Sequence, residues 1–245
     1  MNALAVKGLC KRYPAFSLEN VSFSVPEGAV MGFIGRNGAG KSTTLKALLG
    51  LVHPDAGEVT VLGKSFREEE QYIKERIGVV LGGIDFYPKK KIRVITDVTR
   101  RFYDNWDEGK YRHYLNLFAI DEEKRVDQLS SGMKVKYMIA LALSHDARLL
   151  ILDEPTSGLD PVSRDELTEL LRRLVADGTR SVLFSTHITS DLEKCATHIA
   201  FIKDGEMQYT GSLDDFRDHY KDVGVTLEDI IVHVERRPLD EGAII

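Results

Sequence analysis

Near the start of the chain, the pattern of apolar and polar positions predicts strands and a short helix. Apolar residues alternate with serines over 21–25, which predicts a strand with one buried face. Residues 29–34 form an apolar run that leads directly into a glycine-rich loop, and such a run predicts a buried strand. Leucines over 45–49 share one face of a short helix. A turn then leads to a further strand, predicted over 58–62.

The pattern becomes helical in the middle of the chain. Apolar side chains recur there at helical spacing, so we expect a helical insertion over about 86–145. Strands follow at 149–152 and 181–185, and Pro161 begins a helix between them. Strands that alternate with helices predict an α/β fold with a mainly parallel sheet.

The end of the chain returns to short elements. An Asp-Gly turn at 204–205 separates two short strands, and short helices are expected near 212–220 and 226–235. We expect one domain over 1–220, with the helical insertion inside it, and a short helical extension over 221–245.

Composition narrows the class of protein and of partner. The chain has 245 residues, of which 43% are hydrophobic and 29% charged, as in ordinary globular proteins. Its net charge of −5 argues against non-specific binding to nucleic acid. Cys10 and Cys195 lie outside any metal-ligand spacing and are expected to be reduced thiols. No apolar run approaches the roughly 20 residues that cross a bilayer, and none resembles a signal peptide, so we expect another polypeptide to supply any membrane pathway.

The strongest chemical motif lies between the strand at 29–34 and the helix after it. It has the pattern GxxxxGK[ST], at residues Gly35, Arg36, Asn37, Gly38, Ala39, Gly40, Lys41 and Ser42. Glycines let the backbone turn tightly and bring several N–H groups to a phosphate chain, and the helix directs its positive end at the anion. We expect Lys41 to reach the β- and γ-phosphates and the Ser42 hydroxyl to bind Mg²⁺. The motif predicts a nucleoside triphosphatase.

A second motif ends the apolar strand at 149–152. Asp153 and Glu154 follow this strand directly, at the edge where α/β sheets bind ligands. Asp153 is placed to hold Mg²⁺, and Glu154 to orient and polarise the attacking water. Two solvated acids at the end of a buried strand are the simpler interpretation, but the phosphate loop upstream favours the catalytic one.

Further segments in register with this pair identify the family. The residues shortly before it resemble the LSGGQ signature of ABC (ATP-binding cassette) ATPases and read Leu129, Ser130, Ser131, Gly132 and Met133. Pro155, the loop at 157–160 and His187 match the family pattern as well. The resemblance covers about residues 4–210. It implies a P-loop NTPase core of the RecA type, an antiparallel β subdomain and an inserted α-helical subdomain.

The resemblance also implies residue roles, with ATP and Mg²⁺ as cofactors. Tyr13 resembles the aromatic residue that stacks on adenine, and His187 the switch histidine that contacts the γ-phosphate. The loop that ends at Asp160 resembles the one that communicates across a nucleotide-sandwich dimer. In that dimer, residues 35–43 of one subunit face residues 130–132 of the other, with ATP between them. The implied catalytic residues are Lys41, Glu154 and His187, and the implied metal ligands are Ser42 and Asp153. The implied nucleotide-binding residues are Tyr13, Gly35, Asn37, Gly38, Ala39, Gly40, Lys41, Ser42, Thr43, Ser130, Ser131, Gly132 and Asp160.

Two departures from the family pattern affect these expectations. Ser131 and Met133 replace Gly and Gln in the signature, but a serine still supplies an N–H group and a hydroxyl. Gly82 stands where the Q-loop glutamine is usual, which removes one contact to Mg²⁺ and water, and we expect slow hydrolysis by the isolated subunit. Asp85 is a candidate to replace that contact.

The resemblance implies an ATP-hydrolysing motor of a membrane transporter. The segment after the signature is similar to that of bacterial export ATPases of the bacitracin-resistance type. The expected partners are a second ABC subunit and an integral membrane permease, without nucleic acid, at the cytoplasmic face of the membrane. We expect the permease to dock on residues 86–120. The alternative is an ABC ATPase without a transport role, which acts on nucleic acid, ribosomes or cofactor assembly. A nucleotide kinase would explain neither the signature nor His187.

Overall fold

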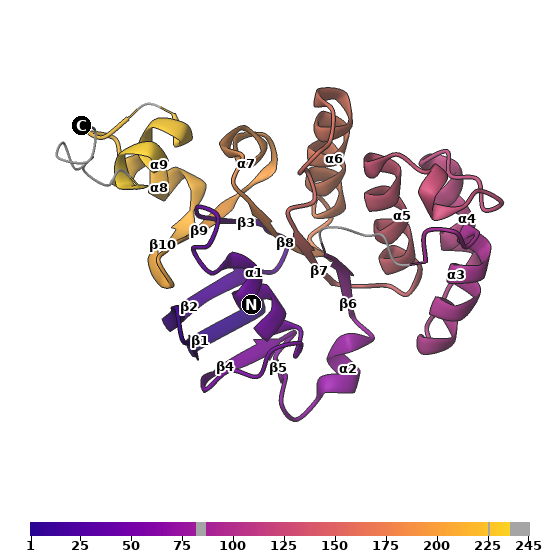
Figure 1. Cartoon of the computed structure of the whole chain (residues 1–245), viewed down its shortest axis with the longest axis horizontal. Helices are drawn as coiled ribbons and strands as arrows, with labels where there is room; N and C mark the ends of the chain where they lie inside the picture. The colour runs from indigo at the N-terminus through magenta and orange to yellow at the C-terminus, as the bar shows by residue number, and fades with distance from the viewer. Residues whose placement is uncertain (82–86, 225, 236–245) are drawn as a thin grey trace.

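The computed structural model describes residues 1–81, 87–224 and 226–235, and two sheets organise them (Figure 1). The larger sheet has the strand order β10-β9-β3-β8-β7-β6, in which only the β9–β10 pair is antiparallel. Its strands are β3 (Val30–Ile34), β6 (Ile77–Val80), β7 (Leu149–Asp153), β8 (Ser181–Thr186), β9 (His198–Lys203) and β10 (Glu206–Ser212). The mainly parallel α/β fold is therefore confirmed, and the buried strands predicted from apolar runs agree with β3, β7 and β8 to within one residue.

The strands of this sheet are apolar throughout because both faces are covered. Leu149 and Ile151 of β7 enter one core, which α1 (Lys41–Leu48) and the second sheet complete. Leu150 and Leu152 enter another core on the opposite face. Helices of the second half of the chain cover that face, namely α5 (Ser131–Ser144), α6 (Pro161–Leu174), α7 (Thr189–Cys195), α8 (Leu213–His219) and α9 (Leu227–Glu235).

The second sheet is antiparallel and has the order β2-β1-β4-β5. Its strands are β1 (Asn2–Tyr13), β2 (Phe16–Pro26), β4 (Ala56–Val61) and β5 (Lys64–Ser65). The strand predicted at 58–62 starts two residues earlier, since Ala56 pairs with β1, and stops before Leu62, which turns with a φ of 49°. We did not predict β1. Register shifts along it break the alternation by which a strand is found.

The predicted helical insertion is present and has a core of its own. It contains α3 (Ile92–Thr99), α4 (Glu108–Leu117) and α5, with short 3-10 turns η1 (Arg100–Phe102) and η2 (Val126–Gln128). Tyr111 of α4 and Tyr137 of α5 both hydrogen-bond the buried hydroxyl of Thr96 in α3, at 2.8 Å each. The short helix α2 (Glu70–Lys74) precedes the insertion and was not predicted, because five residues carry little periodicity.

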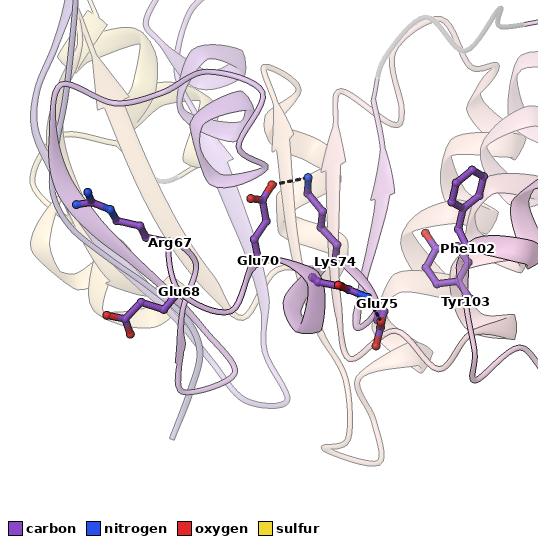
Figure 2. Close-up of a pocket in the computed structure, with 8 residues that line it drawn as sticks. Arg67, Glu68, Glu70, Lys74, Glu75, Phe102 and Tyr103 are labelled. Atoms are coloured by element: carbon purple, nitrogen blue, oxygen red, sulfur yellow. Dashed lines mark hydrogen bonds and ion pairs between the residues drawn. The ribbon is translucent and has the colours of Figure 1, made fainter.

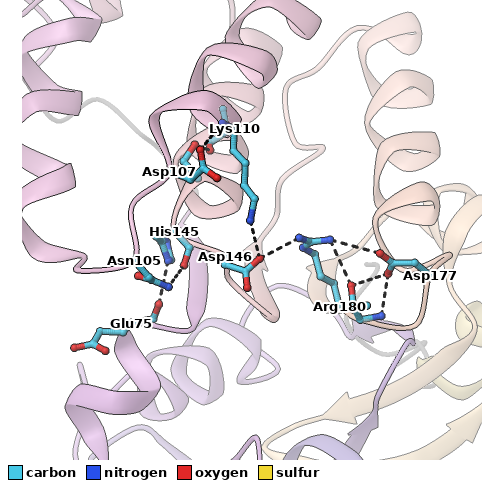
Figure 3. A network of polar contacts seen from close by, with 11 residues as sticks. Glu75, Asn105, Asp107, Lys110, His145, Asp146, Asp177 and Arg180 are labelled. Atoms are coloured by element: carbon cyan, nitrogen blue, oxygen red, sulfur yellow. Dashed lines mark hydrogen bonds and ion pairs between the residues drawn. The ribbon is translucent and has the colours of Figure 1, made fainter.

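A polar network joins the insertion to the large sheet at the end of α5 (Figure 3). The Nδ1 atom of His145 lies 3.1 Å from the carbonyl oxygen of Glu75, and the imidazole stacks on Tyr103 at 3.7 Å between ring centroids. Next to it, Asp146 accepts from Lys110 and Arg180. Burial lowers the pKa of His145 below its ordinary value of 6.5, so the ring is neutral at pH 7, and Nδ1 must carry the hydrogen because a carbonyl only accepts.

We expect this histidine to lower the free energy of unfolding as the pH decreases. The unfolded chain binds a proton at His145 near pH 6.5, whereas the folded chain resists it, so acid favours unfolding. The effect is at most about 1.4 kcal/mol per pH unit. Urea unfolding followed by Trp106 fluorescence at about pH 7.5 and 5.5 measures it. His145→Gln should lose less stability over the same interval. An equal loss would assign the effect to other groups, such as His198.

The C-terminal helices close the second core. Leu227 and Ile230 of α9 are buried in it, and the Lys203 ammonium donates to the carbonyl oxygen of Val234 at 2.7 Å. The helices predicted near 212–220 and 226–235 agree with α8 and α9. Across the described ranges, every helix is too short or too polar to cross a lipid bilayer.

Candidate nucleotide site

The glycine-rich loop joins the strand β3 to α1, and two of its glycines, Gly35 and Gly40, have neighbours with which a side chain would collide. Gly40 has a φ of 112°, and a Cβ atom there would lie 2.6 Å from Leu18 and 2.9 Å from the ring of Phe16. A Cβ atom at Gly35 would collide with the carbonyl oxygen of Ile202. The sharp turn that brings backbone N–H groups together therefore requires glycine at both positions.

Lys41 is enclosed by this loop. Its side chain is only 5% exposed, and its ammonium donates to the carbonyl oxygens of Gly35 at 2.7 Å and Arg36 at 3.3 Å. The Oε1 atom of Glu154 lies 3.4 Å from the same ammonium. A buried cation is thus held at the centre of the loop, where a phosphate chain would meet it.

The acid pair lies at the end of β7, beside the loop. The Oδ1 atom of Asp153 accepts from the Ser42 hydroxyl at 3.3 Å and from Ser185 at 2.6 Å. Glu154 has a φ of 48°, which costs about 1–2 kcal/mol for a residue with a side chain. Its Oε2 atom lies 2.8 Å from Nδ1 of His187. Five of the predicted residues, distant in sequence, therefore converge here: Lys41, Ser42, Asp153, Glu154 and His187.

The donor set at Ser42 and Asp153 fits Mg²⁺. A hydroxyl and a carboxylate are hard oxygen ligands, and they point at each other across the loop. In the part of the chain that the structure describes, no three His, Cys, Asp or Glu side chains gather as a metal cluster. Mg²⁺ commonly needs only one or two protein oxygens beside substrate phosphates, so this sparse set suits it.

The signature and the loop at Asp160 form a second cluster, on the other face of the sheet. Ser130 begins α5 and accepts from the Met133 N–H at 3.2 Å. Asp160 begins α6 in the same way, and hydrogen bonds from Ser163 lower the pKa of its carboxyl. The two helix starts touch, since a Cβ atom at Gly132 would lie 3.2 Å from Ser163.

These two clusters do not complete one site within the chain. α1 belongs to the first core, whereas α5 and α6 belong to the core on the opposite face of the large sheet. Figure 1 shows α5 well to one side of α1. The loop around Lys41 and the signature at 130–132 would therefore need a second subunit to face each other.

Tyr13 lies on the antiparallel sheet, at the hairpin between β1 and β2. It ends β1, pairs with Phe16 of β2, and is 40% exposed. The Phe16 ring packs against Gly40, so the strand that pairs with Tyr13 reaches the loop. Of the remaining loop residues, Asn37 and Gly38 are exposed, Ala39 is buried and Thr43 is half-buried.

Sequence reasoning gave no role to Ser185, although it touches both acids. The signal was slight, because Ser185 directly follows the apolar residues at 182–184, where a strand commonly turns polar. The departure at Gly82, the candidate substitute Asp85 and the docking residue Phe86 lie outside the described residues.

Comparisons with known proteins show the family of this chain. The family model described as ABC transporter matches residues 18–157, over half of the chain. The chain is 34% identical over 193 residues to the bacitracin transport ATP-binding protein BcrA of Bacillus licheniformis, covering 78% of this chain and 63% of that one. It is 37% identical over 201 residues to the Nod factor export ATP-binding protein I of Burkholderia orbicola (strain AU 1054), covering 80% and 66%. The chain thus spans somewhat less than two thirds of the length of these relatives.

A solved structure shares both fold and sequence with the chain. It is described as an ATP-binding subunit of an ABC transporter, and the match has a TM-score of 0.85 and 29% identity. The match covers 96% of this chain and 100% of that one. The family model covers residues 18–157, and Lys41, Ser42, Asp153, Glu154 and His187 gather in one site, so the chain belongs to the ABC transporter family.

Proposed function

We propose that this chain binds and hydrolyses ATP to drive a separate membrane permease, in export. The observation that carries the hydrolytic part is the contact of Glu154 with both Lys41 and His187. The Glu154 carboxylate lies between Lys41 and His187. When phosphate oxygens take over these two partners, the carboxylate is free to accept a proton from water. Release of ADP and phosphate from MgATP by the purified chain tests this part.

Binding begins with an exchange of partners at Lys41. Its ammonium is shared among two backbone carbonyls and Glu154, and phosphate oxygens carry more charge than either carbonyl. Phosphates would therefore take over the ammonium and free the Glu154 carboxylate to face a water molecule. The Tyr13 ring would stack on adenine, since it is exposed and pairs with Phe16, whose ring packs against the loop.

Hydrolysis depends on how the carboxylates are held. Ser42 and Asp153 would hold Mg²⁺, which neutralises phosphate charge when bound. Glu154 orients and polarises the attacking water, and His187 keeps that carboxylate in place and contacts the γ-phosphate. The slow basal rate expected from Gly82 stays a prediction.

A second ABC subunit completes the site. The signature of one subunit would cover the phosphate loop of the other, with two ATP molecules between them. The separation of the two clusters within one chain supports this arrangement, because the N–H groups at the start of α5 offer a further phosphate contact. The loop at Asp160, which adjoins the signature, lies at the same boundary.

The permease would hold the chain at the cytoplasmic face of the membrane. Export is favoured by the two relatives, whose names describe bacitracin transport and Nod factor export.

A cavity of about 650 Å³ lies between α2 and η1 and is lined by Glu70, Lys74, Phe102 and Tyr103, among others (Figure 2). A row of exposed apolar residues leads to it along α3 and η1, namely Val94, Val98 and Phe102, which are 41%, 52% and 74% exposed. Spacing of four residues places Val94 and Val98 on one face of α3, and Phe102 follows them in η1, which suits an apolar-faced helix of the permease.

We expect docking to fail when this row becomes charged. Phe102→Asp should abolish co-purification of the membrane protein encoded beside this chain, because a carboxylate would be buried against an apolar helix. ATP hydrolysis by the isolated subunit should not change. Val232→Asp is the matched control, since Val232 is 50% exposed on α9, outside the insertion. Photo-crosslinks from Tyr87 provide a second readout. Equal retention of the membrane protein by both aspartate variants would contradict this docking surface, and a soluble assembly in its place would favour a role without transport.

A further inference from the structure

Ser185 is a hydroxyl in the interior of the fold. It belongs to β8, between β3 and β7, and is 0% exposed. In the sheet it lies opposite Asp153 on one side and Phe33 on the other. Buried hydroxyl groups in folded proteins are almost always hydrogen-bonded, so the partners of Ser185 show which groups it holds in position.

The partners of Ser185 are the two acidic residues of the site. Its Oγ atom donates to Oδ1 of Asp153 at 2.6 Å and accepts the backbone N–H of Glu154 at 2.9 Å. One hydroxyl thus fixes the carboxylate of the first acid and the backbone of the second. Glu154 needs such support, because its φ of 48° is disfavoured and persists only where neighbours impose it.

We propose that Ser185 is a positioning residue, which aims Asp153 at the metal and keeps Glu154 turned toward the water that attacks ATP. The inference rests on the proposed function. The bond to Oδ1 fixes the rotation of the Asp153 side chain beside Ser42, the other expected ligand. The bond from the Glu154 N–H fixes the direction in which that side chain leaves the strand, toward Lys41 and His187.

The same strand offers a matched control. Ser181 is 2% exposed at the other end of β8, and its hydroxyl also makes one bond of each kind. It donates to the carbonyl oxygen of Pro26 at 3.2 Å and accepts from the Gly28 N–H at 3.0 Å, so it holds a turn away from the acids. Loss of either hydroxyl removes two buried hydrogen bonds, and only Ser185 affects the site.

The test compares Ser185→Ala, Ser185→Thr and Ser181→Ala in the full chain. Electron paramagnetic resonance of Mn²⁺, with a non-hydrolysable ATP analogue, reports metal affinity independently of turnover. We expect Ser185→Ala to weaken Mn²⁺ binding and to lower kcat, each by about 10- to 100-fold. Binding of the analogue without metal should not change. Ser185→Thr keeps the hydroxyl and should recover most of both quantities, and Ser181→Ala should change neither. Thermal unfolding of all three variants shows whether they fold alike.

Each other outcome has a definite meaning. If Ser185→Ala matches Ser181→Ala in both Mn²⁺ affinity and kcat, or if threonine does not restore them in a folded variant, the inference is wrong. A parent chain that binds Mn²⁺ and analogue without hydrolysing ATP would overturn the proposed function, and the Mn²⁺ measurements would still decide the role of Ser185. A parent that binds no nucleotide overturns both.

Discussion

Replacing Lys41 by alanine is expected to weaken ATP binding by roughly 30- to 4,000-fold, which corresponds to about 2–5 kcal/mol. The Lys41 side chain is only 5% exposed inside the phosphate loop, so water cannot replace the charge that the variant lacks. The loop carbonyls of Gly35 and Arg36 would instead face the phosphates and repel them. Equilibrium binding of a fluorescent ATP analogue with Mg²⁺ measures the change.

Lys46 provides the control for this variant. It lies on the same helix, α1, and is exposed, so Lys46→Ala removes the same charge without touching the loop. Its effect on binding should be small, because exposed charges are screened. Equal affinities for the parent and the Lys41→Ala variant would refute the assignment of this loop as the nucleotide site.

Replacing Glu154 by glutamine should leave ATP binding nearly intact and slow hydrolysis by about 10²- to 10⁴-fold. The amide preserves the shape and can still hydrogen-bond His187, but it cannot accept a proton from water. ATP that is bound and not cleaved should hold two subunits together. Phosphate release measures the first effect, and gel filtration with saturating MgATP measures the second.

Glu169→Gln is the control, since Glu169 lies on α6 and pairs only with arginines of its own helix among the contacts that the structure describes. Its variant should hydrolyse ATP as the parent does and remain a monomer after turnover. If Glu154→Gln still hydrolyses ATP at the rate of the parent, another group must activate the water. If it stays monomeric with MgATP, the composite site is wrong.

The sequence was most informative where the residues of a functional motif are adjacent in the chain and the motif requires one local backbone conformation. A phosphate loop needs glycines at fixed spacing between a buried strand and a helix, and all of these are visible in the chain around Lys41. The acids at 153–154 follow an apolar run that can only be an interior strand. Parallel strands bring their carboxyl ends to one edge, which is why Lys41, Glu154 and His187 meet although they are far apart in the chain.

Features that depend on pairing between distant segments could not be predicted. β1 was missed because its bulges hide the alternation, and α2 because it is only five residues long. Ser185 could be noticed only as a polar residue at the end of an apolar run, but its two partners follow from the register of β7 against β8. The contact between the starts of α5 and α6 likewise depends on tertiary packing.

α5 packs in two cores at once, so it couples the orientation of the helical insertion to the large sheet. Tyr137 and Leu141 pack with the insertion, while Ile139 and Leu143 pack under the large sheet. The helix has 14 residues and is therefore about 21 Å long, with Ser130 at its far end. A tilt of about 10° around its core-bound end would carry Ser130 by roughly 4 Å, more than the length of a hydrogen bond. Under the proposed function, a membrane partner that rotated the insertion slightly would therefore displace the signature by a larger distance, and so would control when two subunits close.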